Sequence, residues 1–185
     1  MEPISFLPFT NLESERLLLR QITPDDVQEV FELRSDPETM KYIPRPLLTT
    51  HEEALGHIKM IQDKIENNEG INWAVTLKPD NKLLGIIGHY RIKWEHYRSE
   101  IGYMFLPEAH GKGIATEAIQ LLIDYGFEKM NMHSLEGIID PENEGSARVL
   151  EKNGFIKEAH FKENEFYNGK FIDSVIYSLL KKEKL

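Results

Sequence analysis

Apolar and polar positions in the first third of the chain follow patterns that predict one strand and then helices. The residues RLLLRQI form a short apolar run with strand character, and Thr23 and Pro24, followed by two acids, are typical of a helix start. A second helix start follows in TTHEEA. The elements predicted here are a strand at 16–22 and helices at 24–35, 35–38 and 49–66.

The rest of the chain alternates between β-rich runs and amphipathic segments, separated by turn signals at 78–82 and 168–169. The predicted strands are 71–77, 82–92, 99–105, 133–139, 154–162 and 170–180, and the predicted helices are 113–130 and 143–153. The first of these helices has one narrow polar stripe, so it is expected to pack on a sheet. The order β-α-α-β-β-β-α-β-α-β-β predicts an α/β (α+β) fold with a mixed sheet.

Composition limits the function classes. A chain of 185 residues with 41% hydrophobic and 29% charged residues fits one domain with a substantial core. There is no apolar run near the ~18 residues that a bilayer span needs, and the N-terminal residues lack signal-peptide features. The absence of cysteine excludes disulfides, thiolate catalysis and cysteine-ligated metals. These features favour the cytoplasm and argue against a membrane partner.

The net charge of −9 comes from 22 Lys and Arg against 31 Asp and Glu. A nucleic-acid binder needs a basic footprint, so we expect no nucleic-acid partner. An acidic cleft would attract a cationic substrate, but an acidic surface also simply favours solubility. On charge alone the second explanation is favoured.

The segment 107–119, PEAHGKGIATEAI, places two glycines around a lysine directly before a predicted helix. The first N–H groups of a helix have no intrahelical partner, and the helix dipole adds partial positive charge there, so this position suits a diphosphate. Gly111 and Gly113 would let the backbone approach such a ligand closely. The spacing matches neither a P-loop nor a Rossmann fingerprint. Taken alone, the motif slightly favours ordinary turn chemistry.

The sequence around this motif favours the diphosphate site over ordinary turn chemistry. The segments EIGYMFLPEAHGKGIATEAI and NEGSARVLEKNGF, together with the N-terminal ESERLLLRQITPDDVQEVFELRSDPETMKYI, resemble the GNAT N-acetyltransferase superfamily, and specifically its RimJ/RimL-like branch of ribosomal-protein N-terminal acetyltransferases. The resemblance covers about residues 12–180. It implies one N-acetyltransferase domain over 1–185, a mostly antiparallel mixed sheet flanked by helices, and acetyl-CoA as cosubstrate. His110 stands where the superfamily signature usually has Gln or Arg, a mild departure.

The resemblance also implies which residues contact acetyl-CoA. The pyrophosphate would lie on backbone amides, and the pantetheine arm would pair with the strand before them. In an N-x-x-S motif, the Asn would hold the pantetheine arm and the Ser would lie along the CoA. These positions are His110, Gly111, Lys112, Gly113, Ile114, Ala115 and Thr116 for the pyrophosphate, Met104, Phe105 and Leu106 for the pantetheine arm, and Asn143 and Ser146 for the motif. Asn143 can also be an ordinary helix N-cap and Ser146 a first-turn residue.

Acetyl transfer to an amine needs a neutral amine, a polarised carbonyl, alignment and a departing thiolate. Glu100 matches the position of the superfamily's general base, and alternation places it on one strand face with Met104. The alternative is a solvated glutamate or one paired with Arg91 or Arg98. Glu136, also within a strand, is the competing base.

The general acid cannot be carried over, because Leu150 stands where many relatives have a tyrosine. A CoA thiol with a pKa near ~8.5 is a tolerable leaving group without one, and Ser146 or a water molecule could also donate the proton, so the acid stays unassigned. The histidines lack ligand spacing, so we expect no metal. Trp94 is expected at the rim of the cleft, in contact with substrate.

Three functions remain open. The first is acetylation of a protein N-terminal α-amine, for example on a ribosomal protein, whose pKa of ~7.7–8.0 leaves a useful neutral fraction. The second is acetylation of a small molecule such as a polyamine, an aminoglycoside or an amino acid. The third is an acyl-CoA-binding protein without catalysis. Family members are often dimers, so a homodimer stays open as well.

Overall fold

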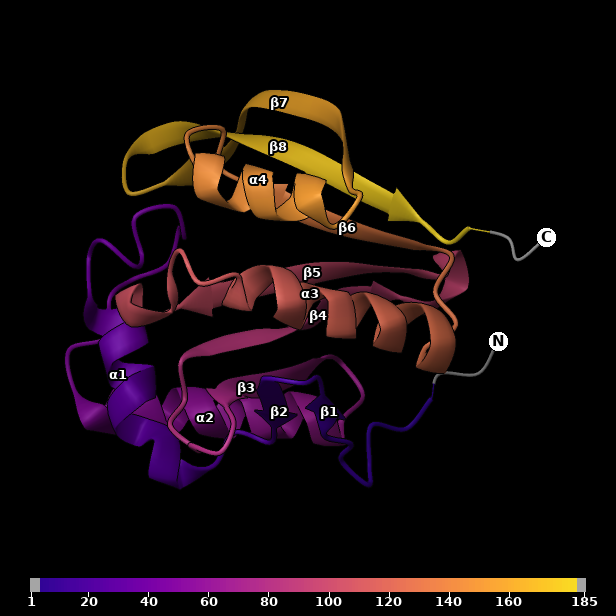
Figure 1. Ribbon diagram of the computed structural model, residues 1–185. Helices are drawn as coiled ribbons and strands as arrows, with labels where there is room; N and C mark the ends of the chain where they lie inside the picture. Colours follow the sequence, from indigo (N-terminus) through magenta and orange to yellow (C-terminus); the bar gives the residue numbers. More distant parts are fainter. Residues whose placement is uncertain (1–3, 183–185) are drawn as a thin grey trace.

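The computed structural model describes residues 4–182, and its centre is an eight-stranded sheet with helices on both faces (Figure 1). The order of the strands across the sheet is β1-β2-β3-β4-β5-β6-β8-β7. Every neighbouring pair is antiparallel except β5 and β6, which run parallel. The strands are β1 Leu12–Glu13, β2 Leu17–Arg20, β3 Ile71–Leu77, β4 Gly85–Lys93, β5 Arg98–Phe105, β6 Ser134–Ile139, β7 Ile156–Tyr167 and β8 Lys170–Leu180.

Four α-helices cover this sheet. They are α1 Val27–Ser35, α2 His51–Glu66, α3 Ile114–Asp124 and α4 Glu144–Lys152. A π-helical segment, Tyr125–Lys129, extends α3, and short 3-10 helices occur at Pro24–Asp26, Trp94–His96 and Pro107–Ala109. Helix α1 packs against α2, which contacts β3, whereas α3 contacts the central strands and α4 contacts β6.

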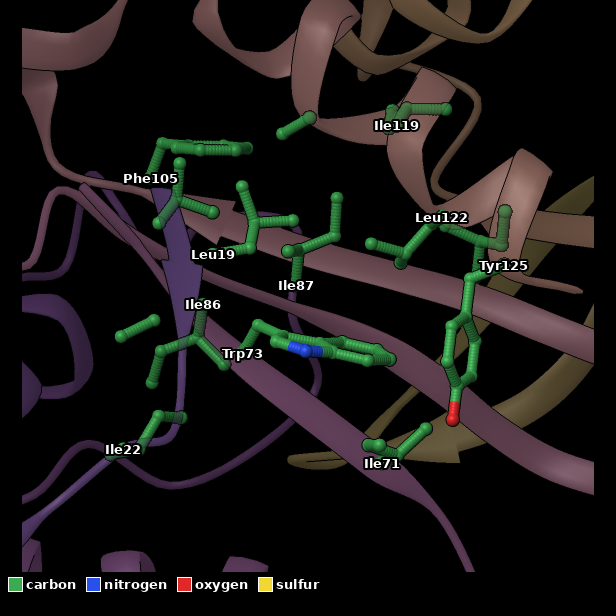
Figure 2. Packing of buried hydrophobic residues seen from close by; sticks show 14 of the residues in the cluster. Leu19, Ile22, Ile71, Trp73, Ile86, Ile87, Phe105, Ile119, Leu122 and Tyr125 are labelled. Atoms are coloured by element: carbon green, nitrogen blue, oxygen red, sulfur yellow. The ribbon is translucent and has the colours of Figure 1, made fainter. Parts of the chain in front are cut away.

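Alternation along the strands divides the core between the two faces of the sheet. Figure 2 shows Ile119 and Leu122 of α3 over the side chains of Leu19 and Ile87, while Ile86 points to the opposite side. All five side chains are at most 2% exposed. Adjacent strand residues point to opposite faces, so one apolar run serves both helical layers.

The predicted α/β fold is confirmed, and the predicted strands and long helices occur in the expected order, preceded by one strand, β1, that was not predicted. Three local expectations need correction. The short helix expected at 35–38 is wrong, because α1 ends at Ser35 and Asp36 instead accepts hydrogen bonds from Thr39 in a turn. The helix expected at 113–130 is α-helical only to Asp124. The strand expected at 154–162 continues to Tyr167.

The parallel strands β5 and β6 separate after a short contact. Their register pairs only Arg98–Glu100 with residues 134–136. Beyond Glu100, β5 continues to Phe105 with β4 as its neighbour, while β6 continues to Ile139 with β8 as its neighbour. The sheet therefore opens between two of its central strands, and the candidate site lies at this opening.

Candidate active site

A cleft of about 430 Å³ opens where β5 and β6 separate. Its walls come from the segment between α1 and α2, from the two diverging strands, from the start of α4 and from the β7–β8 hairpin. Of the sequence-predicted residues, Glu100, Met104, Asn143 and Ser146 line this cleft together. The β7–β8 hairpin is a wall of the cleft that the sequence did not indicate.

The backbone of β5 offers hydrogen-bonding groups to this opening. The N–H of Leu106 donates to the carbonyl of Leu84 at 2.8 Å, so this amide is directed toward β4. Backbone groups alternate along a strand, so the amides of Phe105 and Tyr103 are directed the other way, into the opening. The side chain of Phe105 is itself buried in the core. Of the three positions expected to pair with a pantetheine arm, Phe105 has the free amide.

The glycine loop lies at the N-terminus of α3, and its conformation explains both glycines. Gly111 and Gly113 have φ angles of +71° and +73°, which side chains other than glycine rarely adopt. A Cβ at Gly111 would meet nothing within 4 Å, and one at Gly113 would meet only the Arg16 guanidinium, 3.6 Å away. No side chain caps the helix that begins at Ile114. The loop thus presents backbone N–H groups beside open space, which fits a diphosphate.

Arg16 is a residue near the loop that sequence reasoning missed. Its Nη1 donates to the carbonyl of Lys112 at 3.3 Å, and its guanidinium forms a 2.5 Å ion pair with Glu117 in the first turn of α3. Arg16 therefore brings a second cation beside Lys112. The two partners are about a hundred positions apart, so no local pattern could have indicated the contact.

Glu100 projects into the cleft from β5 and is 15% exposed. Its carboxylate accepts a hydrogen bond from Arg91 at 3.0 Å, so the arginine pairing considered from the sequence does occur, with Arg91 and not with Arg98. Burial raises the pKa of Glu100 above its ordinary value, although Arg91 acts in the opposite direction. The side chain is thus placed and tuned to accept a proton within the cleft.

Glu136, the competing acid, is held in a different arrangement. It lies directly opposite Glu100 in the parallel register, but it is buried and accepts a hydrogen bond from Arg98 Nε at 2.8 Å. The same guanidinium donates to Ser134 and Ser178. Glu136 is absent from the described cleft lining. Its carboxylate is therefore part of a hydrogen-bond network, centred on Arg98, that links β6 to β5 and β8.

The start of α4 supplies the other wall of the opening. The side chain of Asn143 accepts from the N–H of Ser146 at 3.0 Å, so Asn143 is the N-cap of α4 as well as a cleft residue. Leu150 packs directly over Gly137 of β6, with its methyl groups about 3 Å from where a Cβ would stand. The position that carries a tyrosine in many relatives is thus filled by a packing leucine.

Two tyrosines in the cleft were missed by the sequence analysis. The Tyr103 hydroxyl donates to the carbonyl of Ser146 at 3.4 Å, on the α4 side of the sheet. Tyr90 is the cross-strand partner of Glu100, and its hydroxyl accepts from the amide of Asn72. Burial raises the pKa of each tyrosine to about 12, so both stay protonated at neutral pH.

Trp94 does not have the expected position. Its ring packs on Phe6 with centroids 6.2 Å apart, and it is absent from the described cleft lining, so the expectation of substrate contact is wrong. Within residues 4–182, no group of three His, Cys, Asp or Glu side chains is arranged to hold a metal ion. In the same range, no helix is both long and apolar enough to cross a bilayer.

Comparison with known families gives one match that covers most of the chain. The sequence model of the acetyltransferase (GNAT) domain family matches residues 16–156. Among curated relatives, the uncharacterized N-acetyltransferase YoaA of Bacillus subtilis (strain 168) is 32% identical over 173 residues, which cover 94% of this chain and 98% of the relative.

Solved structures show the same fold. An acetyltransferase (GNAT family) from Bacillus anthracis has a TM-score of 0.82 at 34% identity, covering 92% of this chain and 98% of its own. A spermidine N-acetyltransferase from Vibrio cholerae, solved with CoA and spermine, has a TM-score of 0.79 at 25% identity over 90% of this chain and 96% of its own. A ribosomal-protein-S5-alanine acetyltransferase from Vibrio fischeri has a TM-score of 0.80 at 25% identity over 92% and 96%.

Proposed function

This chain belongs to the GNAT acetyltransferase family, whose members transfer an acetyl group from acetyl-CoA to an amine, and we propose that its acceptor is the α-amine of a protein N-terminus. The observation that carries the proposal is the place of Glu100, a largely buried carboxylate with a raised pKa at the opening between β5 and β6. An α-amine has a pKa of ~7.7–8.0, so a modest base suffices to keep it neutral.

The donor side of the proposal rests on two features of the backbone. The open loop at Gly111 and Gly113, with the uncapped start of α3, would hold the pyrophosphate on N–H groups from Gly111 to Ala115, with Thr116 in the first turn. The expected N–H of His110 is not available, because it donates to the carbonyl of Pro107 at 3.1 Å. The free amides of Phe105 and Tyr103 would pair with the pantetheine arm like an added strand. Acetyl-CoA supplies the activated thioester.

The acceptor would approach from the face of the sheet that carries Glu100, opposite to the face that α4 covers. Tyr90 and Glu100 are cross-strand partners and share a face, whereas Tyr103 faces α4. Glu100 would take a proton from the amine, directly or through water, as the amine attacks the thioester carbon. Tyr103 would give a proton to the departing sulfur, in place of the tyrosine that Leu150 replaces. Base and acid would then act from the two faces of one opening.

A small-molecule amine is the second candidate, because the spermidine enzyme of Vibrio cholerae shares this fold at the same identity as the ribosomal-protein enzyme of Vibrio fischeri. A turnover screen with acetyl-CoA against peptides with free N-termini, polyamines, aminoglycosides and amino acids separates the two. We expect peptides to give the highest kcat/KM. A preference for spermidine would overturn the proposed acceptor, and binding of acetyl-CoA with no turnover on any amine would support an acyl-CoA-binding protein.

Other features of the chain follow from the family resemblance and belong to the same proposal. They are one N-acetyltransferase domain over residues 1–185, a ribosomal-protein N-terminus as the specific acceptor, a place in the RimJ/RimL-like branch, a location in the cytoplasm and a homodimer. Light scattering of the purified protein tests the dimer, and acetylation of extracted ribosomal proteins tests the acceptor.

A further inference from the structure

The acceptor side of the cleft contains a guanidinium without a charge partner. Arg34 lies in the last turn of α1 and lines the cleft. Its Nε is buried and has no hydrogen-bond partner, and no other buried side-chain nitrogen or oxygen within residues 4–182 lacks one. Within the described part of the chain, its terminal nitrogens make one hydrogen bond, from Nη1 to the sulfur of Met40 at 3.6 Å, and sulfur is a weak acceptor.

No carboxylate in the described chain compensates this charge. Burial lowers the pKa of Arg34, and Arg45 lowers it further, while the groups that raise it are the phenols of Tyr90 and Tyr167. Arg45, from the segment between α1 and α2, lines the same cleft together with His57 and Lys64 of α2. Burial, Arg34 and Lys64 lower the pKa of His57 to about 4, so this imidazole is neutral at pH 7 and can donate a hydrogen bond.

The carboxylates of the cleft are mostly engaged elsewhere. Glu100 pairs with Arg91, Asp173 pairs with His160 at 2.7 Å, and Asp140 accepts from the N–H of Glu142. Glu69 and Glu165 also line the cleft, and neither forms an ion pair with Arg34 within residues 4–182. Arg34 is a half-buried cation whose Nε is buried without a hydrogen-bond partner, which is costly, and arginine is suited to holding a carboxylate with two parallel hydrogen bonds.

We propose that the acceptor carries a carboxylate close to its reactive amine, and that Arg34 binds this carboxylate while Glu100 faces the amine. The inference rests on the proposed function and specifies its substrate class. In a peptide acceptor the carboxylate is an acidic side chain next to the N-terminal residue, and in a free amino acid it is the molecule's own. A polyamine, which carries positive charge throughout, would place an ammonium near Arg34 and Arg45.

Arg34 belongs to the acceptor side and not to the acetyl-CoA side. It lies near Tyr90, which shares a sheet face with Glu100. The glycine loop and the N-terminus of α3, with Arg16 and Lys112, lie outside the described lining of this cleft. A change at Arg34 should therefore leave acetyl-CoA binding intact.

The test uses two short peptides that begin Ser-Asp and Ser-Asn, which are nearly isosteric and differ in one charge. Binding of each to the CoA-saturated protein is measured by calorimetry, and turnover by release of free CoA. We expect the wild type to favour the acidic peptide by about 10-fold or more, as a charge-assisted hydrogen bond predicts. Arg34→Gln should abolish this preference, and Arg34→Lys should keep part of it.

The matched control is Lys59→Gln, which removes an exposed cation of α2 that pairs with Asp63. It should leave the preference unchanged. Thermal unfolding of Arg34→Gln provides a further check, because removal of an unpaired, half-buried charge should not lower the melting temperature. A marked fall would indicate a structural role for Arg34 and would count against the proposal.

The outcomes separate this inference from the proposed function. Equal binding of the two peptides by the wild type, or a preference that survives Arg34→Gln, overturns the inference alone. Selective binding of the acidic peptide without acetylation supports the inference and overturns the proposed function. If free aspartate binds in an Arg34-dependent way and neither peptide does, the result supports carboxylate binding by Arg34 and identifies the acceptor as a small molecule.

Discussion

The guanidinium of Arg91 lies 3.0 Å from the carboxylate of Glu100, across the irregularity where β4 departs from its register with β5. Arg91 has a positive φ of 43°, which swings it out of regular pairing at this bulge. Burial raises the pKa of Glu100 and Arg91 lowers it, so the geometry of one bulge adjusts the proton affinity of the candidate base.

Glu100→Gln should lower turnover by ~10²–10⁴ while leaving acetyl-CoA affinity almost unchanged, because a positioned base contributes about this much. The loss should shrink at high pH, where more of the amine is already neutral, and it should shrink more for an α-amine than for an alkyl amine. Steady-state kinetics between pH 6 and about 10 measure both effects. Wild-type turnover in the variant would remove Glu100 from the mechanism, and a loss that is flat with pH would indicate a positioning role.

Arg91→Gln should shift the acidic limb of the kcat/KM profile to higher pH. Arg91 favours the charged carboxylate, so its removal raises the pKa of Glu100 further, and the base is then deprotonated only at higher pH. The matched control is Arg148→Gln, which removes an exposed arginine that pairs with Glu144 on α4. An unchanged acidic limb in Arg91→Gln would show that another group controls it.

Gly113→Asp should abolish acetyl-CoA binding in a protein that still folds. Aspartate tolerates positive φ better than most residues and is a good N-cap, so α3 should persist, but its carboxylate would occupy the proposed phosphate position. Gly169→Asp is the control, because Gly169 also has a positive φ, +81°, with no atom within 4 Å of a Cβ. Calorimetry should show loss of binding only for Gly113→Asp. Equal affinity in both variants would contradict the assignment of the loop.

Tyr103→Phe should reduce kcat by about 10-fold and leave the affinity for CoA near its original value, because a thiol with a pKa near ~8.5 leaves without much assistance. The hydroxyl lost is the one that donates to Ser146, so the packing of the ring is retained. Comparison with an acyl donor whose thiol has a lower pKa gives the check. With such a donor, the kcat of the variant should be close to that of the wild type. An equal loss of kcat with both donors would exclude proton donation by Tyr103.

The sequence predicted those parts of the site that depend on local patterns. Alternation placed Glu100 on one face of β5 with Met104, and the two glycines predicted a loop that needs positive φ. The cleft itself depends on where β5 leaves β6, and the partner of the Tyr103 hydroxyl, the carbonyl of Ser146, comes from an element 43 positions away. The helix expected at 35–38 failed for a local reason, because the Asp36 carboxylate accepts hydrogen bonds from Thr39 and stabilises a turn there.

The stability of the fold should fall as the pH drops from about 6.5 to about 4, and His89 provides a specific cause. His89 is fully buried, and its ring donates to the carbonyl of Leu122 at 3.0 Å and accepts from the hydroxyl of Ser99 at 2.9 Å. Burial lowers its pKa from 6.5 to about 4. Within this pH range the unfolded chain binds a proton that the folded chain does not, so the stability present above pH 6.5 decreases as the pH falls.

The difference of about 2.5 pKa units corresponds to about 3 kcal/mol of unfolding free energy between the two limits. Urea denaturation at pH 7 and at about pH 5, between which about 2 kcal/mol of this loss falls, measures it in the wild type and in His89→Gln. The variant should be less stable at pH 7, because glutamine does not reproduce both hydrogen bonds, but its stability should depend less on pH. His96→Gln replaces an exposed histidine and should keep the wild-type slope. An identical slope in His89→Gln would assign the acid sensitivity to other groups, of which the half-buried His57 is the next to test.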